Sequence, residues 1–362
     1  MKEGWEYRKL KECCKELFAG GDVPKPDVSK NKTYHFSVPI YTNGVENEGL
    51  YGYTSNARVN EPAVTISARG TIGAIFRRYT PFFPAIRLIT AVPQKDLLSV
   101  DYLYYSLKTL TVGNSGTSIP QLTIPNIKNI YIPIPPLSEQ QSIVDYLDSA
   151  FTKIDAMKTN AEKRLNEAKT LFQASLKEML EPKEGWEEKT LPEISENLDS
   201  IRKPVTKGKR TAGIYPYYGA SGIVDYVDDY LFDEDLLCIS EDGANLLMRT
   251  YPIAFPISGK VWVNNHAHVL RFKSIITQKY VEYFFSGMKL DKYITGAAQP
   301  KLTQKALNNI IINLPSTLDT QQSIVTTLDS LKSKVDRLQA NYDKISLECD
   351  ALKQAILRQV FE

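Results

Sequence analysis

Two stretches of the chain carry apolar residues at alternating spacings of three and four. In residues 318–362 the pattern runs without a break through Ile324, Leu328, Leu331, Val335, Leu338, Tyr342, Ile345, Cys349, Leu352 and Ile356. In residues 138–182 it runs through Ile143, Leu147, Ala150, Ile154, Met157 and Ala161, slips at Leu165, and resumes through Ala168, Phe172 and Leu176. Such long, narrow stripes are typical of coiled coils, so we predict two long antiparallel helices that pack on each other.

The sequence also marks where each helix starts. Ser138 followed by Gln141, and Asp319 followed by Gln322, predict a capping box at both starts. Three prolines within residues 133–136 end whatever strand precedes the first helix. The alternative is a pair of amphipathic helices on two unrelated cores. It is less favoured because the two stripes match position for position.

The whole chain consists of two copies of one unit. Residues 140–144 recur as residues 321–325, an offset of 181, and "EGWE" at Glu3 recurs at Glu184. "GTSIPQLT" recurs as "GAAQPKLT" at an offset of 180. Internal repeats of this kind predict a repeated architecture. We therefore divide the chain into a globular region (residues 1–137), a helix (138–182), a second globular region (183–317) and a second helix (318–362).

The globular regions are rich in short runs of Tyr, Ile, Val and Gly broken by turn residues, a pattern that predicts strands and loops. The fold class is therefore α+β, with a pseudo-two-fold tandem repeat. "VTISARGTIG" in the first region corresponds to "LCISEDGANL" in the second, and each is an apolar strand that enters a Gly-centred turn. A long spacer between two similar, inverted modules suits a target that is itself two-fold. Duplex DNA is such a target, because its half-sites are read at a fixed spacing.

Composition restricts where DNA could bind. The chain has 362 residues, 43% of them hydrophobic and 24% charged, with a net charge of +2. Any surface for nucleic acid must therefore be local. The four cysteines form no C-x-x-C pair, which favours reduced thiols in a cytoplasmic protein. We expect no secretory signal and no membrane span, since no apolar run reaches the ~18 residues that a span needs.

One local basic run is a candidate phosphate-contacting arm. Residues 200–210, "SIRKPVTKGKR", hold five basic side chains and no acidic one. The alternative is an ordinary solvated loop, which is the more common explanation for a short run. The acidic stretch 225–235 argues against contact between its own face and phosphate.

Metal and catalytic signals are weak. No cysteine or acidic cluster accompanies His266 and His268 to complete a set of ligands, which favours one structural, inward histidine over a metal site. The chain has no Walker phosphate loop, no dinucleotide fingerprint and no nucleophile elbow. It also lacks the Asn/Asp-Pro-Pro-aromatic run expected of an enzyme that methylates an amino group on a base. These absences favour a binding protein over an enzyme.

The chain resembles the DNA-specificity subunits of type I restriction–modification systems over nearly its full length. The resemblance rests on "IPIPPLSEQQSIVDYLD" and "LPSTLDTQQSIVTTLD" before the two helices and on "ISARGTIG" in the first module. In the second module it rests on "YYGASGIVDYV", "ISEDGAN" and "VWVNNHAHVL". Two departures are a short chain for the family and Ser316-Thr317 at the second junction, where the first copy has Pro136.

The resemblance implies a non-catalytic protein that binds no cofactor itself. Two target-recognition domains would each read one half of a split, asymmetric sequence in double-stranded DNA. The antiparallel helices would set the gap between the half-sites and dock two methyltransferase subunits. Those partners would bind S-adenosylmethionine and methylate adenine, and separate restriction subunits would use ATP and Mg²⁺. The alternatives are an inactive or recombination-donor copy, a coiled-coil scaffold that binds only proteins, and a self-contained nuclease or methyltransferase.

The resemblance and the basic side chains together give the candidate DNA-binding residues. Asp242 is unsuited to phosphate, so it would accept a hydrogen bond from a cytosine amino group. Glycines in these turns serve backbone geometry more often than contact. The candidates are Arg69, Gly70, Thr71, Arg77, Arg78, Lys207, Lys209, Arg210, Tyr218, Gly219, Ser221, Asp242, Asn245, Lys260, Asn264, Asn265 and His266.

Overall fold

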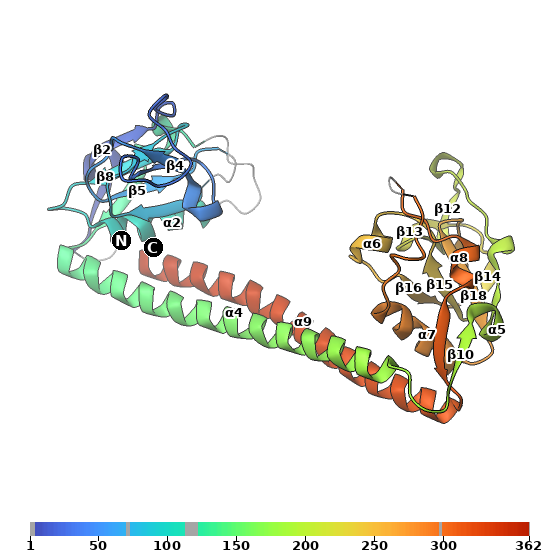
Figure 1. Cartoon of the computed structure of the whole chain (residues 1–362). Helices are drawn as coiled ribbons and strands as arrows, with labels where there is room; N and C mark the ends of the chain where they lie inside the picture. Colours follow the sequence, from blue (N-terminus) through green and yellow to red (C-terminus); the bar gives the residue numbers. More distant parts are fainter. Residues whose placement is uncertain (1–3, 70–72, 113–121, 297–298, 362) are drawn as a thin grey trace. The chain divides into compact units, whose positions relative to one another are not determined.

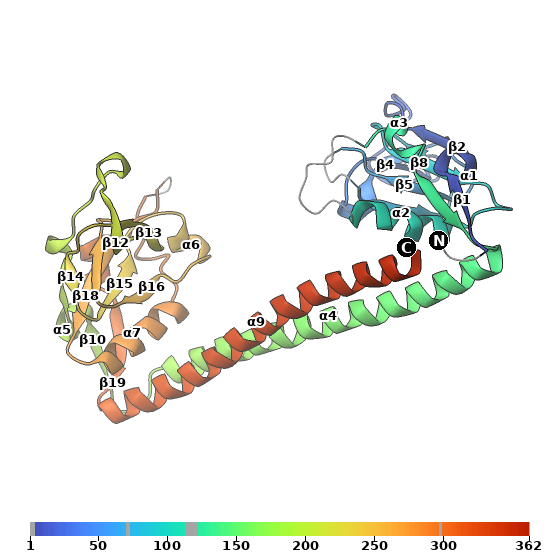
Figure 2. The ribbon, with the colours of Figure 1, turned by 180° about the vertical axis from the view of Figure 1, so that it is seen from behind.

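The computed structural model describes residues 4–69, 73–112, 122–296 and 299–361. The chain divides into two compact units (Figures 1 and 2), one formed by residues 1–161 with 342–362 and the other by residues 162–341. Two 44-residue helices, α4 (Leu137–Leu180) and α9 (Leu318–Phe361), each contribute to both units.

The first unit contains a four-stranded antiparallel sheet in the order β2-β8-β5-β6, a three-stranded sheet in the order β4-β3-β7, and the pair β1-β9. Helix α2 packs between the four-stranded sheet and α4 (Figure 1). The strands are β1 (Glu6–Lys9), β2 (Cys14–Ala19), β3 (Val38–Tyr41), β4 (Leu50–Thr54), β5 (Ala63–Ile66), β6 (Ile75–Arg78), β7 (Phe83–Pro84), β8 (Ile89–Pro93) and β9 (Tyr131–Ile134). The short helices are α1 (Leu10–Cys13), η1 (Glu46–Gly49), α2 (Val100–Val112) and α3 (Ile124–Ile127).

The second unit repeats this plan. Its sheets have the orders β11-β18-β15-β16 and β13-β12-β17-β14, and its strand pair is β10-β19. The strands are β10 (Trp186–Thr190), β11 (Ser195–Asn197), β12 (Ala212–Gly219), β13 (Gly222–Val227), β14 (Phe232–Asp233), β15 (Leu236–Ser240), β16 (Ala254–Ile257), β17 (Lys260–Val263), β18 (Ala267–Phe272) and β19 (Ile311–Pro315). The helices are α5 (Leu191–Ile194), η2 (Asp199–Ile201), η3 (Lys207–Lys209), α6 (Asn245–Met248), α7 (Ile275–Gly287) and α8 (Gln304–Asn308).

The matching strand orders confirm the predicted tandem repeat and the α+β fold class. Each unit also contains one parallel strand pair, β3 with β7 in the first and β12 with β17 in the second. The large side chains with no exposed area include Tyr102 and Phe82 in the first unit and Tyr280 and Phe285 in the second. Each unit therefore has its own core.

The long helices run antiparallel in both units, as predicted. In the first unit, the Lys158 ammonium lies 3.6 Å from the Asp350 carboxylate, and Lys353 pairs with Asp155. In the second unit, Lys169 donates to the Gln339 side-chain oxygen at 2.8 Å. Residues further along α4 therefore meet residues earlier in α9.

Some positions of the predicted stripe on α4 and α9 are wrong. Met157 and Leu352 are 59% and 47% exposed, and the neighbouring Lys158 and Lys353 take their places in the stripe. The lysine stems pack along the helix while their ammonium groups reach a carboxylate on the opposite helix. With Lys158 included, the alternation runs unbroken from Lys158 to Leu165, which is 3% exposed, so the slip of two consecutive spacings of four lies at Ile154 and not at Leu165.

The predicted capping boxes are also wrong, because Ser138 and Asp319 already lie inside the helices, which begin at Leu137 and Leu318. The second helix is capped by Thr317, whose hydroxyl accepts from the Thr320 amide at 3.3 Å. Gln141 instead donates to Asp145 on the surface of α4.

The preceding residue, Gln140, is completely buried. Its side-chain oxygen accepts from the Ser99 amide at 3.0 Å, and its amide group donates to the Leu97 and Pro135 carbonyls, each at 2.9 Å. One glutamine therefore ties the start of α4 to the segment that leads into α2.

Two tyrosines of α2 complete this attachment. The Tyr102 hydroxyl donates to the Pro133 carbonyl at 3.0 Å, and the Tyr105 hydroxyl donates to the Asp148 carboxylate at 2.5 Å. Burial raises the pKa of both hydroxyls, and an acceptor beside Tyr105 raises its pKa further. Both phenols therefore stay protonated and can donate. We call these bonds, with those of Gln140, the docking contacts.

The second unit repeats the docking contacts. Gln321, 4% exposed, accepts from the Thr277 hydroxyl at 2.8 Å and donates to the Pro315 carbonyl at 2.9 Å. The remaining bonds join Tyr280 to the Asn313 carbonyl at 2.7 Å and Tyr283 to the Asp329 carboxylate at 2.6 Å. The two copies are offset by 180 residues at Pro135 and Pro315 but by 181 residues at Gln140 and Gln321. The second copy therefore has one extra residue at this junction, and it keeps the glutamine contact.

The end of the other long helix covers each docking site. In the first unit, Leu357 and Phe361 of α9 are buried, and the Phe361 ring centre lies 5.4 Å from that of Tyr102. In the second unit, Leu176 of α4 is buried in one cluster with Tyr283 and Leu328. Both helices therefore contribute to the core of each unit.

We predict that Gln140→Leu destabilises the first unit by about 3 kcal/mol, because it leaves a buried amide and two buried carbonyls without partners. Hydrogen exchange followed by mass spectrometry would detect lost protection in residues 97–112 and 122–134. Gln141→Leu is the matched control, because Gln141 is exposed, and it should change protection little. Equal effects of the two substitutions would contradict this role for Gln140.

Candidate nucleic-acid interface

Three turns of the second unit converge at one end of its sheets. The Asn264 amide donates to the Tyr218 carbonyl at 3.1 Å, and the Ser240 hydroxyl donates to the Ala220 carbonyl. A Cβ added at Gly219 would lie 3.1 Å from Val224 and 3.5 Å from the Asn264 amide group, so this packing leaves little room for a larger residue. The structure thus brings together the turns that follow β12, β15 and β17, which we call the turn cluster.

Asp242 and His266 form a pair within this turn cluster. The Nδ1 atom of His266 lies 2.9 and 3.0 Å from the two Asp242 carboxylate oxygens. The Asp242 side chain is 14% exposed, whereas that of His266 is 48% exposed. Both oxygens of Asp242 face the imidazole. This geometry does not support the expectation that Asp242 accepts a hydrogen bond from a cytosine amino group. His266 is the exposed member of the pair.

A buried ionic network lies next to the turn cluster. The Arg202 guanidinium bonds to Glu241 at 2.6 Å and to Asp199 at 3.1 Å, and Lys301 lies 3.1 Å from Glu241. His268 has no exposed area, and its ring nitrogens lie 2.6 Å from Asp199 and 2.8 Å from the Leu302 carbonyl. The network therefore fixes Glu241, the residue before Asp242, and His268, two residues after His266.

Charge neutralisation within the network keeps its carboxyl groups ionised. Burial alone would raise the pKa of Asp199, but its hydrogen bond and charge interaction with His268 lower that pKa below the usual value. Burial likewise opposes ionisation of Glu241, while the hydrogen bond from Arg202 lowers its pKa.

Among the described residues, Asp199, Glu241 and His268 form a group that could hold a metal ion, with ligand atoms within 4.8 Å of one another. Arg202 already supplies a positive charge to both carboxylates, so this group fits an ionic network better than a metal site. The sequence predicted one structural, inward histidine of the two, and the structure shows that it is His268.

Several candidate residues of the second unit lie outside the turn cluster and have partners of their own. Arg210 pairs with Asp225 at 2.9 Å and lies over the Tyr217 ring. The Asp225 side chain is 36% exposed, so solvent screens this ion pair and we assign it little energy. Asn245 closes a loop by exchanging two hydrogen bonds with Tyr251. The candidates with exposed side chains are Lys207, Lys209 and Lys260 outside the turn cluster, and Ser221, Asn265 and His266 within it.

In the first unit, Arg69 is exposed three residues after the end of β5, whereas Gly70 and Thr71 lie outside the described residues. Asn43, which the sequence did not single out, accepts from the Ala68 amide at 2.7 Å and donates to the Ile86 carbonyl. It joins three segments at the start of the Arg69 turn. The only signal was its position in "VPIYTNGV", opposite "YPYYGASGI" of the second copy.

Arg77 does not lie in a surface suited to DNA. It bonds to Asp101 of α2 at 2.8 Å and lies 3.4 Å from Asp148 of α4, so it reinforces the docking contacts. Its guanidinium also lies 4.5 Å from the centre of the Tyr104 ring. The prediction that Arg77 contacts DNA is not supported.

Arg78 is only 3% exposed. Its guanidinium bonds to Glu48 at 2.9 Å and to Thr65 at 3.1 Å, and lies 3.5 Å from the centre of the Tyr41 ring. Because it is enclosed on all these sides, it cannot reach a phosphate, and the prediction for Arg78 is wrong.

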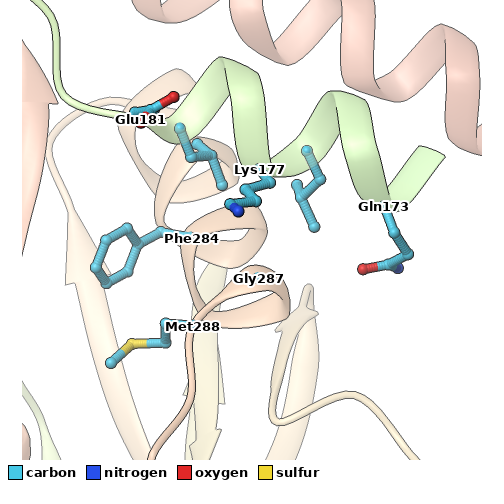
Figure 3. A pocket seen from close by; sticks show the side chains of 8 residues that line it. Gln173, Lys177, Glu181, Phe284, Gly287 and Met288 are labelled. Carbon is cyan, nitrogen blue, oxygen red and sulfur yellow. The ribbon is translucent and has the colours of Figure 1, made fainter. Parts of the chain in front are cut away.

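A pocket of about 440 Å³ lies beside α7 in the second unit, away from the turn cluster (Figure 3). Apolar groups from α4 and α7 line it, with Lys177, Glu181 and Gln173 at its sides. Its composition is that of a packing groove between helices.

None of the helices in the described ranges is long and apolar enough to cross a membrane.

The lowered pKa values of Asp199 and Glu241 predict a specific acid sensitivity. Their unfolded pKa values would be about 3.9 and 4.3. Since the folded values are lower, the stabilisation is complete above about pH 5 and is lost as the pH falls through the folded pKa values. Each carboxyl can contribute up to about 1.4 kcal/mol per pH unit to this loss.

This loss can be measured by urea unfolding between pH 6 and pH 3, with hydrogen exchange reporting the free energy of unfolding of the second unit. Asp199→Asn should make the pH dependence of its free energy of unfolding shallower. Asp233→Asn removes an exposed carboxyl as the matched control and should leave the slope nearly unchanged. If Asp199→Asn left the slope unchanged, the network would not be the source of the acid sensitivity.

Comparison with known proteins identifies relatives that match part of the chain. A putative type I specificity subunit of Mycoplasma pneumoniae (strain ATCC 29342 / M129 / Subtype 1) is 34% identical over 151 residues, which are 41% of this chain and 41% of that protein. A putative type I restriction enzyme specificity subunit of Haemophilus influenzae (strain ATCC 51907 / DSM 11121 / KW20 / Rd) is 36% identical over 157 residues, 43% and 40% of the two chains. These matches span about two fifths of the relatives' length.

Longer matches are more distant. The EcoprrI type I specificity subunit of Escherichia coli is 23% identical over 354 residues, covering 91% of this chain and 84% of that one. A chain in a solved structure of a type I restriction–modification system has a TM-score of 0.77 at 17% identity, covering 100% of this chain and 98% of its own length. The HsdS subunit of Thermoanaerobacter tengcongensis has a TM-score of 0.59 at 17% identity, covering 100% and 97%. These structures support the fold.

The family comparison covers most of the chain. The model of the type I restriction modification DNA specificity domain matches residues 2–167 and again residues 183–347. The two matches coincide with the two copies of the repeat described above. The chain therefore belongs to the family of type I restriction–modification DNA specificity domains and carries two of them in tandem.

Proposed function

We propose that this chain gives a type I restriction–modification complex its DNA sequence specificity. The modules of residues 1–137 and 183–317 would each read one half of a split, asymmetric target in double-stranded DNA. The observation that carries the proposal is a contrast between the two copies. The docking contacts on α4 and α9 are repeated, whereas the exposed turns of the two modules differ in sequence. Equivalent docking with different turns suits a protein that reads two different half-sites.

In the second module, we assign base contact to the turn cluster. His266 would approach a base edge in the major groove, with its ring orientation fixed by Asp242. Asn265 and Ser221 are exposed on neighbouring turns and offer further hydrogen-bonding groups. Lys207, Lys209 and Lys260 would contact phosphates and so add affinity without sequence information. In the first module, Arg69 would take the base-reading position together with Gly70 and Thr71.

The chain's role in such a complex would be positioning rather than chemistry. Two methyltransferase subunits, docked on the helices, would bind S-adenosylmethionine and methylate an adenine extruded from the duplex. Restriction subunits would supply ATP- and Mg²⁺-dependent activity. This chain would bind none of these cofactors. With a net charge of +2 it should bind DNA weakly without its cytoplasmic partners.

The experiment that tests this function is a map of N6-methyladenine in a methylation-free host. The host would express the methyltransferase encoded beside this chain, with and without the chain. We expect a split, asymmetric motif only when the chain is present. A continuous palindromic motif would contradict two separate readers. Methylation that did not depend on the chain would favour a scaffold, and absence of any motif would favour an inactive copy.

The same map tests the residue assignments. His266→Ala should lower methylation about tenfold, or relax one base of one half-site, because a good base contact is worth roughly 1–3 kcal/mol. Arg69→Ala should affect only the other half-site and so acts as the reciprocal control. If both substitutions changed the same half-site, the division of reading between the two modules would be wrong.

A further inference from the structure

The first module presents one aromatic side chain entirely to solvent. Tyr34, in the segment between β2 and β3, has a relative exposure of 103%. The other strongly exposed tyrosines of this module, Tyr79 and Tyr131, are 56% and 60% exposed. A tyrosine gains stability from its ring only when the ring is covered. Full exposure on a protein that acts in a complex therefore suggests that a partner covers Tyr34.

The segment that carries Tyr34 is held in place at its base. Ser29 and Tyr53 exchange two backbone hydrogen bonds, each 2.8 Å long. A Cβ added at Gly52 would lie 2.5 Å from the Ser29 carbonyl oxygen, so this approach requires glycine. Asp27 accepts hydrogen bonds from Thr54 and Ser55. The segment is therefore attached to β4 before it turns outward.

The tip is a closed turn. The Thr33 amide donates to the Phe36 carbonyl at 3.0 Å, and the Phe36 amide donates to the Thr33 hydroxyl at 3.0 Å. Tyr34 and His35 occupy the two central positions, and the His35 ring meets the Phe36 ring edge-on with centres 4.8 Å apart. The dark-blue segment between β2 and β3 rises from the side of the unit away from α4 (Figure 1). A closed turn presents the Tyr34 ring at little entropic cost.

The charges around Tyr34 indicate which partner would cover it. Lys30 and Lys32 precede it, and both are exposed. The Lys30 ammonium lies 4.1 Å from the centre of the Tyr51 ring, a contact that holds the lysine beside the turn. The sequence of residues 28–37 contains no acidic residue, and the carboxyl just before it, Asp27, is occupied by hydroxyl and amide donors. Exposed cations beside an exposed ring match the phosphates and the faces of bases or sugars in nucleic acid.

We propose that residues 30–35 form a DNA-contacting turn of the first module, in which Lys30 and Lys32 bind phosphates and Tyr34 packs against a base or sugar in the adjoining groove. The inference rests on the proposed function, since it assigns a contact within the same protein–DNA complex. It adds a second element to the first module, separate in sequence from the Arg69 turn. The competing explanation is that a partner protein, rather than DNA, covers the exposed Tyr34 ring.

The test uses the complete complex with its methyltransferase subunits and two labelled duplexes, one bearing the mapped motif and one scrambled. Tyr34→Ala should weaken binding about tenfold, in keeping with the loss of one aromatic contact to a base. Lys30→Gln with Lys32→Gln should reduce the slope of log affinity against log salt by about 2. Tyr131→Ala is the matched control, because Tyr131 is also exposed with a lysine, Lys9, near its ring. It should leave the affinity for both duplexes unchanged.

The outcomes separate this inference from the proposed function. If the wild-type complex makes a split motif while both turn variants bind DNA normally, the turn is not a DNA contact and the proposed function stands. If Tyr34→Ala prevents assembly with the methyltransferase, the turn contacts protein and the inference is wrong. If the turn variants weaken DNA binding although the wild type makes no split motif, the inference stands and the proposed function fails.

Discussion

The structure depends on a buried glutamine at the start of each long helix. Gln140 and Gln321 are enclosed among carbonyl, amide and hydroxyl groups that would otherwise be buried without partners. Leaving such groups unpaired costs more than the bonds themselves contribute, so this requirement fixes one geometry for the attachment of a module to its helix. Tyr105 and Tyr283 extend the attachment along the helix to Asp148 and Asp329.

This attachment separates two tasks within each module. Polar groups that hold a module on the helices lie on α2 or α7 and on the strand before the helix, and they recur in both copies. The candidate base-reading residues, which differ between the copies, lie on turns elsewhere in the sheets. In the second module, the Arg202 network holds these turns from inside, so the exposed side chains can vary while the backbone stays in place. Under the proposed function, this division lets two modules read different half-sites from equivalent attachments.

The sequence predicted the repeat, the two antiparallel helices and the α+β class, because these follow from local patterns of period three and four and from self-similarity. It misplaced the phase of the helices, because Lys158 and Lys353 pack their stems in the stripe while Met157 and Leu352 face solvent, which depends on carboxylates from the opposite helix. It assigned the capping role to Gln141 because the buried role of Gln140 depends on backbone groups 41 and 43 residues away.

The candidate site was predicted with similar limits. The residue types of the turn cluster were found, but the pairing of Asp242 with His266 joins residues 24 positions apart and carries no local signal. Arg77 and Arg78 looked like surface cations because a lone arginine in a sequence does not reveal its acidic partners, which come from α2, α4 and η1. Tyr34 was missed because exposure is a property of the fold, and tyrosines are frequent in this chain.

The central claim is that both modules are held equivalently and differ only in what they read. Its most direct test is a chain in which the two modules, residues 5–134 and 186–314, are exchanged while both long helices stay in place. This chain would be expressed with the same methyltransferase, and N6-methyladenine would be mapped in the host DNA. Equivalent docking predicts the same split motif with the same spacing, because the exchanged protein reads the target from the opposite strand. A stable complex that methylates a different motif, or the same half-sites at a changed spacing, would contradict the account.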